Sequence, residues 1–173
     1  MSAVSDLTVV ALSGGVDSAI AAALLQEQGH RVQGLFMHNW DEDEQGYCTA
    51  AQDFQDARRV AERLDIPLHR VDFTREYRAE VFEDFLRRYR QGQTPNPDVL
   101  CNRHIKFGVC LDYARRLGAT RFATGHYARI AHTQGVYRLC KARDGGKDQT
   151  YFLHNIDPAV LPQVLFPLGD LVK

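Results

Sequence analysis

The stretch LTVVALSGGVDSAIAAALL, Leu7–Leu25, places a short glycine-containing turn between two apolar runs. We expect a buried strand at Leu7–Leu12 and a helix at Ser18–Gln28. The turn Ser13–Ser18 then joins the carboxyl end of the strand to the helix N-terminus. Two adjacent glycines let backbone N–H groups converge there, and the helix adds unpaired N–H groups and the positive end of its dipole. The stretch therefore predicts an anion cradle of a size that suits pyrophosphate.

The turn SGGVDS differs from the common phosphate-binding loops, because it lacks the lysine of a Walker A loop and the spacing of GxGxxG. Ser13 and Ser18 add hydroxyl donors to the cradle. Asp17 is unfavourable beside a phosphate unless it binds Mg²⁺ or caps the helix, and both uses stay open. The alternative is a tight strand–helix turn with no ligand.

Strands and helices are expected to alternate along the rest of the chain. The expected strands are Val32–His38, Leu68–Phe73 and Arg121–Thr124, the helices are Ala50–Leu64, Glu76–Tyr89 and Arg103–Leu117, and Tyr127–Ile130 pairs with Val136–Cys140 as a hairpin. Two prolines predict a loop at Gln91–Asp98, and the tail is expected to break at Pro158, Pro162 and Pro167. Such alternation is typical of a doubly wound, mostly parallel α/β sheet with helices on both faces. Ligands bind such sheets beyond the carboxyl ends of the strands.

Length and composition favour one compact domain over residues 1–173, since 173 residues with 45% hydrophobic content can bury a proper core. The sequence has no apolar run that could span a bilayer and no secretory signal, so we expect a cytoplasmic protein without a membrane partner. Its four cysteines lack the spacing of zinc ligands. They are expected to be reduced thiols, and no metal site is predicted from them.

Charge is divided unevenly along the chain. Residues 1–84 carry 7 Lys and Arg against 16 Asp and Glu, whereas residues 85–150 carry 13 against 4. This division favours a polyanionic partner for the second half of the chain. The alternative is that opposite charges intermingle on the folded surface.

The SGGVDS turn resembles the signature of the PP-loop ATP pyrophosphatases. LFMHNW, YCTAAQDFQDARRVAERLDIPLHRVDF, GQTPNPDVLCNRHIKF, ATGHYARI and KDQTYFL are similar, in order, to segments of the tRNA-specific 2-thiouridylase family, over essentially the whole chain. The resemblance implies an adenine nucleotide α-hydrolase-like, Rossmann-like fold. Proteins of that family are longer, so we expect a catalytic domain in which residues 143–173 begin the connection to further regions. Arg78 departs from the aromatic residue that many members carry.

The resemblance implies thiolation of the wobble uridine of tRNA at C2, with ATP and Mg²⁺ as cofactors and AMP and pyrophosphate as products. The residues implied to bind ATP are Ala11, Leu12, Ser13, Gly14, Gly15, Val16, Asp17, Ser18, Met37 and Gly125. Met37 could equally be an ordinary core residue. The implied sulfur source is a cysteine persulfide supplied by a donor or relay protein. The family's second catalytic cysteine, which forms a disulfide with the first, has no counterpart among the four cysteines here.

Cys101 is the candidate nucleophile. It follows a proline-rich loop and is expected at a helix N-terminus near Arg103, His104 and Lys106, which would lower its pKa. A buried, inert cysteine is the alternative. Asp98, three residues earlier, is the candidate general acid–base, with a helix cap as its alternative.

Other segments receive roles from the resemblance or remain without one. Asn96, Pro97 and Asp98 are implied to contact the target base, which would be flipped out of its stack, and Lys147, Asp148 and Gln149 are implied to contact tRNA. Cys110 is expected in the core, Cys48 and Cys140 receive no catalytic role, and Asp41–Glu44 is expected to be a solvated loop.

Two other functions are alternatives. Another PP-loop ligase, of the amidotransferase or argininosuccinate type, would have no use for PNPDVLCN or for a basic half. A non-enzymatic nucleotide-binding sensor would have no need of a nucleophilic cysteine beside a rigid loop.

Overall fold

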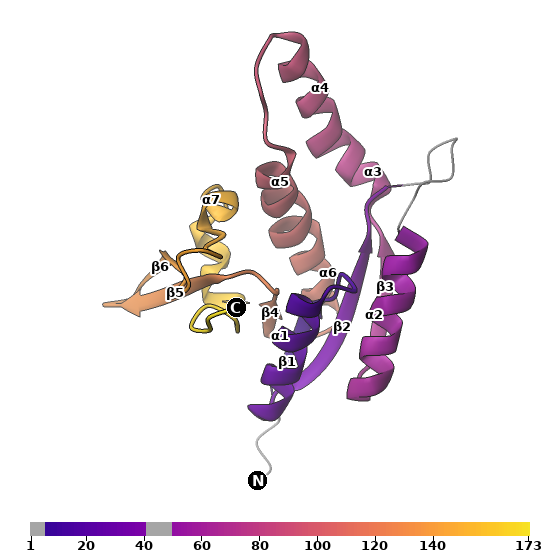
Figure 1. Ribbon diagram of the computed structural model, residues 1–173, viewed down its shortest axis with the longest axis vertical. Helices are drawn as coiled ribbons and strands as arrows, with labels where there is room; N and C mark the ends of the chain where they lie inside the picture. Colours follow the sequence, from indigo (N-terminus) through magenta and orange to yellow (C-terminus); the bar gives the residue numbers. More distant parts are fainter. Residues whose placement is uncertain (1–5, 41–49) are drawn as a thin grey trace.

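A computed structural model describes residues 6–40 and 50–173 of the chain. Its centre is a five-stranded parallel sheet with the order β3-β2-β1-β4-β7 (Figure 1). Strand β1 (Leu7–Ala11) lies in the middle and pairs with β2 (Arg31–His38) on one side and β4 (Arg121–Ala123) on the other. All five residues of β1 are buried, as expected for a strand covered on both faces. The predicted doubly wound parallel sheet is therefore confirmed.

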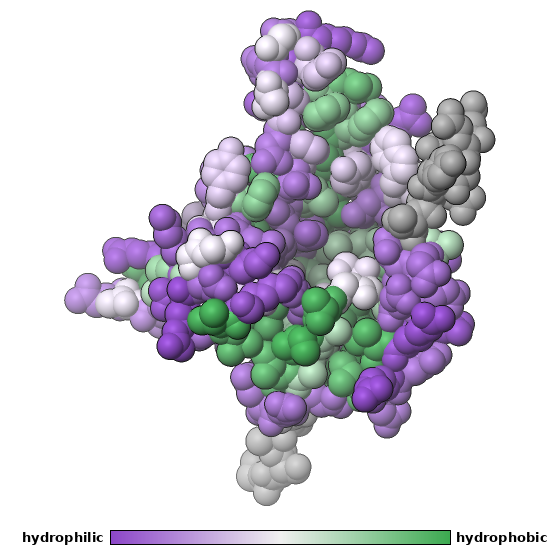
Figure 2. Space-filling view, viewed as in Figure 1, coloured by the Kyte–Doolittle hydropathy of each residue, from purple (hydrophilic) through white to green (hydrophobic). Residues whose placement is uncertain are grey.

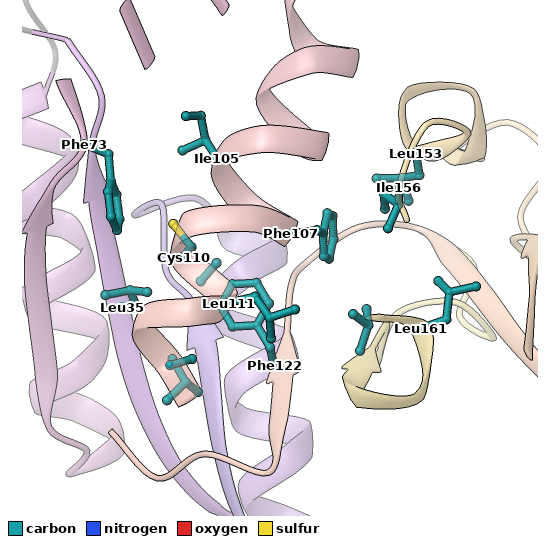
Figure 3. Close-up of a cluster of buried hydrophobic side chains, with 14 of the residues drawn as sticks. Leu35, Phe73, Ile105, Phe107, Cys110, Leu111, Phe122, Leu153, Ile156 and Leu161 are labelled. Carbon is teal, nitrogen blue, oxygen red and sulfur yellow. The ribbon is translucent and has the colours of Figure 1, made fainter. Parts of the chain in front are cut away.

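Alternate residues of β1 point into two separate hydrophobic cores. Val10 packs on one side with helix α1 (Val16–Glu27) and α2 (Ala50–Leu64). Val9 packs on the other side, where Phe122 and Ile105 belong to the core shown in Figure 3. Because side chains of a strand alternate between faces, a single central strand anchors both helical layers.

The second layer consists of two long helical runs, each interrupted by a wide turn. The first run contains α3 (Thr74–Tyr77), the π-helical η1 (Arg78–Phe82) and α4 (Glu83–Arg90), and it starts where β3 (Leu68–Asp72) ends. The predicted helix at Glu76–Tyr89 is confirmed in extent, although the π turn was not expected. Figure 1 shows α4 projecting away from the sheet.

The second run begins earlier than the sequence predicts. It comprises α5 (Pro97–Leu100), the π-helical η2 (Cys101–Cys110) and α6 (Leu111–Arg116). The expected loop at Gln91–Asp98 is therefore wrong in its last two residues. Pro97 occupies the first helical position, where its missing N–H costs nothing, and the Asn96 side chain caps the helix by accepting the Asp98 N–H at 3.0 Å.

The chain leaves the sheet after β4 and returns to it near its end. The predicted hairpin is confirmed as β5 (Ala128–Thr133) and β6 (Val136–Lys141). Helix α7 (Thr150–Leu153) and the 3-10 helix η3 (Pro158–Gln163) follow, and β7 (Val164–Leu165) adds the fifth strand beside β4. Pro158 lies at the break between α7 and η3 and Pro167 follows the end of β7, as expected, whereas Pro162 lies within η3 and breaks nothing.

Helix α1 carries apolar residues on its outer face as well as its inner one. Val16 and Ile20 are 64% and 44% exposed, and Figure 2 shows hydrophobic residues gathered on this side of the molecule. Within residues 6–40 and 50–173, no helix is both long enough and apolar enough to cross a bilayer.

Replacement of Leu35 tests the hydrophobic core shown in Figure 3. Leu35 of β2 is fully buried among the residues of Figure 3, so Leu35→Ala should lower the free energy of unfolding by about 2–5 kcal/mol. Urea denaturation followed by circular dichroism measures the change. The control is Leu171→Ala at a residue that is 40% exposed, which should change stability by less than about 0.5 kcal/mol. Equal losses in the two variants would contradict this description of the core.

Candidate nucleotide site

The SGGVDS turn joins the carboxyl end of β1 to the N-terminus of α1, as its sequence predicts. Gly15 is the N-cap residue of α1, with an extended backbone, so no side chain caps this helix end. Ser18 supports the turn from inside the helix: its Oγ accepts the Ser13 N–H at 3.2 Å and donates to the Gly15 carbonyl at 2.9 Å. Among the described residues, the N–H groups of Val16 and Asp17 have no backbone acceptor, so they remain available to an anion.

Two glycines make the close approaches of the site possible. Gly14 has φ +87°, and a Cβ there would lie 2.5 Å from the Asp53 carbonyl oxygen. A Cβ on Gly125 would lie 2.7 Å from the Asp17 carbonyl carbon and 2.7 Å from the Ser18 nitrogen. The segment after β4 therefore touches the backbone of the first turn of α1, and only glycine permits this contact.

A cavity of about 190 Å³ opens between the ends of β1, β2 and β4. It is lined by six predicted ATP-site residues, Ala11, Ser13, Asp17, Ser18, Met37 and Gly125, together with Lys106, Thr124, His126 and Gln149. The strand order reverses between β1 and β4, so the cavity lies at the switch point of the sheet. The Leu12 side chain instead lies in the core, and its N–H donates to the Leu35 carbonyl at 2.9 Å.

Sequence reasoning missed Lys106, Thr124 and His126 as residues of this cavity. Thr124 and His126 flank Gly125 directly after β4, so the rule that ligands meet strand ends could have found them. The position of Lys106 depends on the winding of η2, which the sequence did not reveal.

His126 is a neutral imidazole in this environment. Burial, followed by the charge of Lys106, lowers its pKa from 6.5 to about 3. Its Nδ1 lies 2.7 Å from the Thr124 hydroxyl, and its ring packs near Phe107 and Phe166. The wall next to the cradle therefore offers a hydrogen-bonding group without a charge.

Asp17 does not cap its helix, so that reading of the sequence is wrong. It lies one residue beyond the start of α1, and its two carboxylate oxygens accept from the Lys173 ammonium at 2.7 and 2.8 Å. No cluster of three or more metal-ligating side chains occurs in the part of the chain that the structure describes. Of the described residues, Asp17 is the one carboxylate that lines the cavity, so a bound Mg²⁺ would need phosphate oxygens and water as its other ligands.

Cys101 lies in a different environment from the expected helix N-terminus. The helix starts four residues earlier, at Pro97, so the Cys101 N–H donates to the Pro97 carbonyl and is not one of the free N–H groups of the helix end. Burial raises the pKa of the Cys101 thiol; Lys106 acts in the opposite direction, and Asp98 raises the pKa further. The predicted low pKa is therefore wrong for the protein without ligands.

Two acidic groups surround the thiol of Cys101. Asp98 is exposed in the first turn of α5, and the Tyr77 phenol lies on α3, where burial and the charges of Cys101 and Asp98 raise its pKa. Asp98 is not the helix cap, because Asn96 performs that role. Cys110 is fully buried, as predicted, and burial raises the pKa of its thiol strongly.

A second cavity, of about 310 Å³, lies beside the loop that precedes α5. Asn96 lines it together with Arg88 of α4 and with Tyr151 and His154 at α7. Pro97 and Asp98 do not line it. Asn102 fixes α7 against the helix that carries Cys101, because its amide donates to the Phe152 carbonyl at 3.1 Å.

The segment Lys147–Gln149 combines an exposed lysine with two structural side chains. Asp148 accepts the Ala142 N–H at 2.8 Å, and Gln149 accepts the Tyr127 N–H at 2.9 Å and also lines the nucleotide cavity. Of the residues given no catalytic role, Cys140 lies half-buried on β6. Cys48 and Asp41–Glu44 fall outside the described residues.

Comparison with known proteins gives a family match over nearly the whole chain. The model of the "tRNA methyl transferase HUP domain" family matches residues 6–173. The chain belongs to this HUP-domain family. The tRNA-specific 2-thiouridylase MnmA of Methylococcus capsulatus is 58% identical over 166 residues, which cover 95% of this chain and 45% of that protein. MnmA of Legionella pneumophila is 53% identical, with 95% and 46% covered.

A solved structure has a similar fold. A 4-thiouridine synthetase in complex with RNA and bound ATP superposes with a TM-score of 0.61 at 19% identity, covering 95% of this chain and 37% of that one. The chain thus spans less than half the length of the curated relatives that it matches.

Alkylation of Cys101 tests the corrected view of its thiol. Because burial raises its pKa, the thiolate fraction at pH 7 is small, and iodoacetamide should react more slowly with Cys101 than with an unstructured peptide thiol. The pH midpoint of the rate, followed by peptide mapping, should lie above 9.0, the ordinary value for a cysteine. Cys110 should react more slowly still. A midpoint below 9.0 would contradict this view.

Proposed function

We propose that this HUP domain binds ATP with Mg²⁺ and activates the C2 carbonyl of the wobble uridine of tRNA for thiolation, as part of a tRNA 2-thiouridylase. The observation that carries the proposal is the cavity at the switch point, where unpaired N–H groups of the cradle meet a neutral wall and a lysine. The identity to MnmA proteins, which are named as tRNA-specific 2-thiouridylases, supports the substrate and the reaction.

The residues divide the chemistry between two neighbouring places. The cradle holds the phosphates, so that the uridine O2 attacks the α-phosphorus and pyrophosphate leaves against the N–H groups of Val16 and Asp17. A persulfide sulfur carried by the family's second catalytic cysteine, which a donor or relay protein loads, then attacks C2, and AMP leaves with the former O2. Cys101 attacks the sulfur atom of that cysteine, which breaks the S–S bond, frees the 2-thiouridine and leaves a disulfide between the two cysteines.

Asp98 and the loop before α5 receive the base in this scheme. Asp98 is exposed three residues before Cys101, which leaves its carboxylate free to exchange protons with the uracil ring. The cavity beside Asn96 and Tyr151 offers an amide and an aromatic ring of the kind that bind unstacked bases. The exposed Lys147 and the basic balance of residues 85–150 suit the tRNA backbone.

Substitution of Gly15 should block the nucleotide without disturbing the fold. Gly15 has φ −78° and ψ 158°, which valine adopts readily, and an added Cβ would meet only the Ser13 Oγ, at 3.5 Å. In Gly15→Val the isopropyl group competes with phosphate for the space beside the cradle. Calorimetry should show at least about a tenfold loss of ATP affinity in the presence of Mg²⁺, or about 1.4 kcal/mol.

Gly145→Val serves as the matched control, since a Cβ on Gly145 meets nothing within 4 Å. Equal ATP affinity in the two valine variants would show that the cradle is not part of the nucleotide site.

The reaction itself is tested in a chimera. The chain replaces the matching 166 residues of the Methylococcus capsulatus relative, and 2-thiouridine in tRNA is measured by mass spectrometry in cells lacking their own enzyme. The chimera should restore 2-thiouridine, and Cys101→Ser should abolish it while ATP binding persists. Pyrophosphate release that does not depend on tRNA, with no 2-thiouridine formed, would instead favour another PP-loop ligase.

A further inference from the structure

Lys106 occupies a position between the nucleotide cavity and the Cys101 thiol. It lines the cavity together with Ser13, Ser18 and Gly125, and it lies on the same π-helical segment as Cys101. A π-helix bonds residue i to residue i+5, so residues five apart lie on one side of it. Figure 3 shows this spacing for Ile105 and Cys110, whose side chains lie on the same side of η2.

The same spacing relates Lys106 to Cys101. In an α-helix, residues five apart would be separated by about 140° around the axis, because each residue turns by about 100°. The π-helical winding of η2 instead brings the lysine to the side of the thiol, and the same lysine lines the cavity. A wide turn at this point thereby joins two parts of the site that a regular helix would separate.

The ammonium of Lys106 has no carboxylate partner within 4.0 Å among residues 6–40 and 50–173. The other lysine near the cavity, Lys173, is paired with Asp17 at 2.7 Å. Lys106 is also half-buried, so its charge is only partly screened by water. An unpaired, half-buried cation that lines a cavity beside the free N–H groups of the cradle favours an anionic ligand.

The charge of Lys106 acts on groups on both sides of it. It lowers the pKa of the His126 imidazole in the wall of the cavity, and it lowers the pKa of the Cys101 thiol against the larger effect of burial. The other described groups that interact with the Cys101 charge are Asp98 on α5, Tyr77 on α3 and Cys110 on η2. Lys106 is the one cation in this set.

We propose that Lys106 is a further residue of the reaction centre, whose ammonium binds a phosphate oxygen of the nucleotide on one side and supports the Cys101 thiolate on the other. This inference rests on the proposed function of the site as an ATP site. Because one ammonium serves both anions, they compete for it. Bound triphosphate therefore keeps Cys101 as a thiol, and departure of pyrophosphate releases the lysine to favour the thiolate, after the carbonyl has been activated.

The test uses the 173-residue chain with Lys106→Met, Lys106→Arg and the control Lys141→Met, an exposed lysine on β6 outside both cavities. Calorimetry measures the affinity for a non-hydrolysable ATP analogue with Mg²⁺. Iodoacetamide labelling measures the pH midpoint of Cys101. Lys106→Met should weaken the analogue about tenfold and raise the midpoint, whereas Lys106→Arg and Lys141→Met should stay near the original protein.

The competition has its own readout. The bound analogue should raise the pH midpoint of Cys101 in the original protein and leave it unchanged in Lys106→Met. Simple shielding of the thiol would slow labelling equally in both proteins without moving the midpoint, and that result would overturn the competition. Unchanged analogue affinity and an unchanged midpoint in a folded Lys106→Met would overturn the role of Lys106 itself.

If Lys106→Met does not fold, Lys106→Gln takes its place. Glutamine keeps a polar side chain but removes the charge, so it should give the effects expected of Lys106→Met. None of these readouts requires tRNA. If the analogue affinities and the Cys101 midpoints change as expected but the chimera forms no 2-thiouridine, the proposed reaction alone is contradicted. A chain that thiolates tRNA with Lys106→Met as well as with lysine would contradict the present inference alone.

Discussion

The contact between Gly125 and the first turn of α1 is the constraint on which the site depends. A side chain at this position would collide with the backbone at Asp17 and Ser18, so the segment after β4 and the N-terminus of α1 approach each other as closely as two backbones can. This approach fixes the distance between the donors of the cradle and the wall that carries Thr124 and His126. It is possible only because β1 and β4 are neighbours at the point where the strand order reverses.

The architecture was largely readable from the sequence because its signals are local and periodic. Buried strands such as β1 are short apolar runs, and the helix expected at Ala50–Leu64 is present as α2 with the same bounds. Strand β7 was not predicted from the sequence. Its two residues lie between a proline-containing helix and a turn, carry no periodicity, and become a strand only by pairing with β4. The start of the helix at Pro97 was not predicted either, because a proline inside a loop and a proline at the first helical position look alike in sequence.

The site was predictable where it follows strand ends and unpredictable where it depends on helix winding. The turn Ser13–Ser18 follows β1 directly, and Gly125, which the family resemblance implied, follows β4 directly and lines the same cavity as Ser13 and Ser18. The environment of Cys101 differs from the expected one, because the helix starts at Pro97 and the thiol is largely buried, as in the alternative that the sequence left open. The π-helical register of η2 places Lys106 by long-range packing of this segment against α3, η1 and α7, which no window of the sequence contains.

The two walls of the nucleotide cavity come from distant parts of the chain. The cradle lies at Ser13–Ser18, whereas the opposite wall is contributed by Lys106, Gly125 and Gln149. A chain emerging from the ribosome therefore exposes its cradle long before the other wall exists, and β1 must wait for β4, more than a hundred residues later, to acquire its second neighbour. Contacts of such sequence separation slow folding. The central strand and the apolar α1 are consequently the parts of this domain most exposed to misassociation during synthesis, when a chaperone would have most to protect.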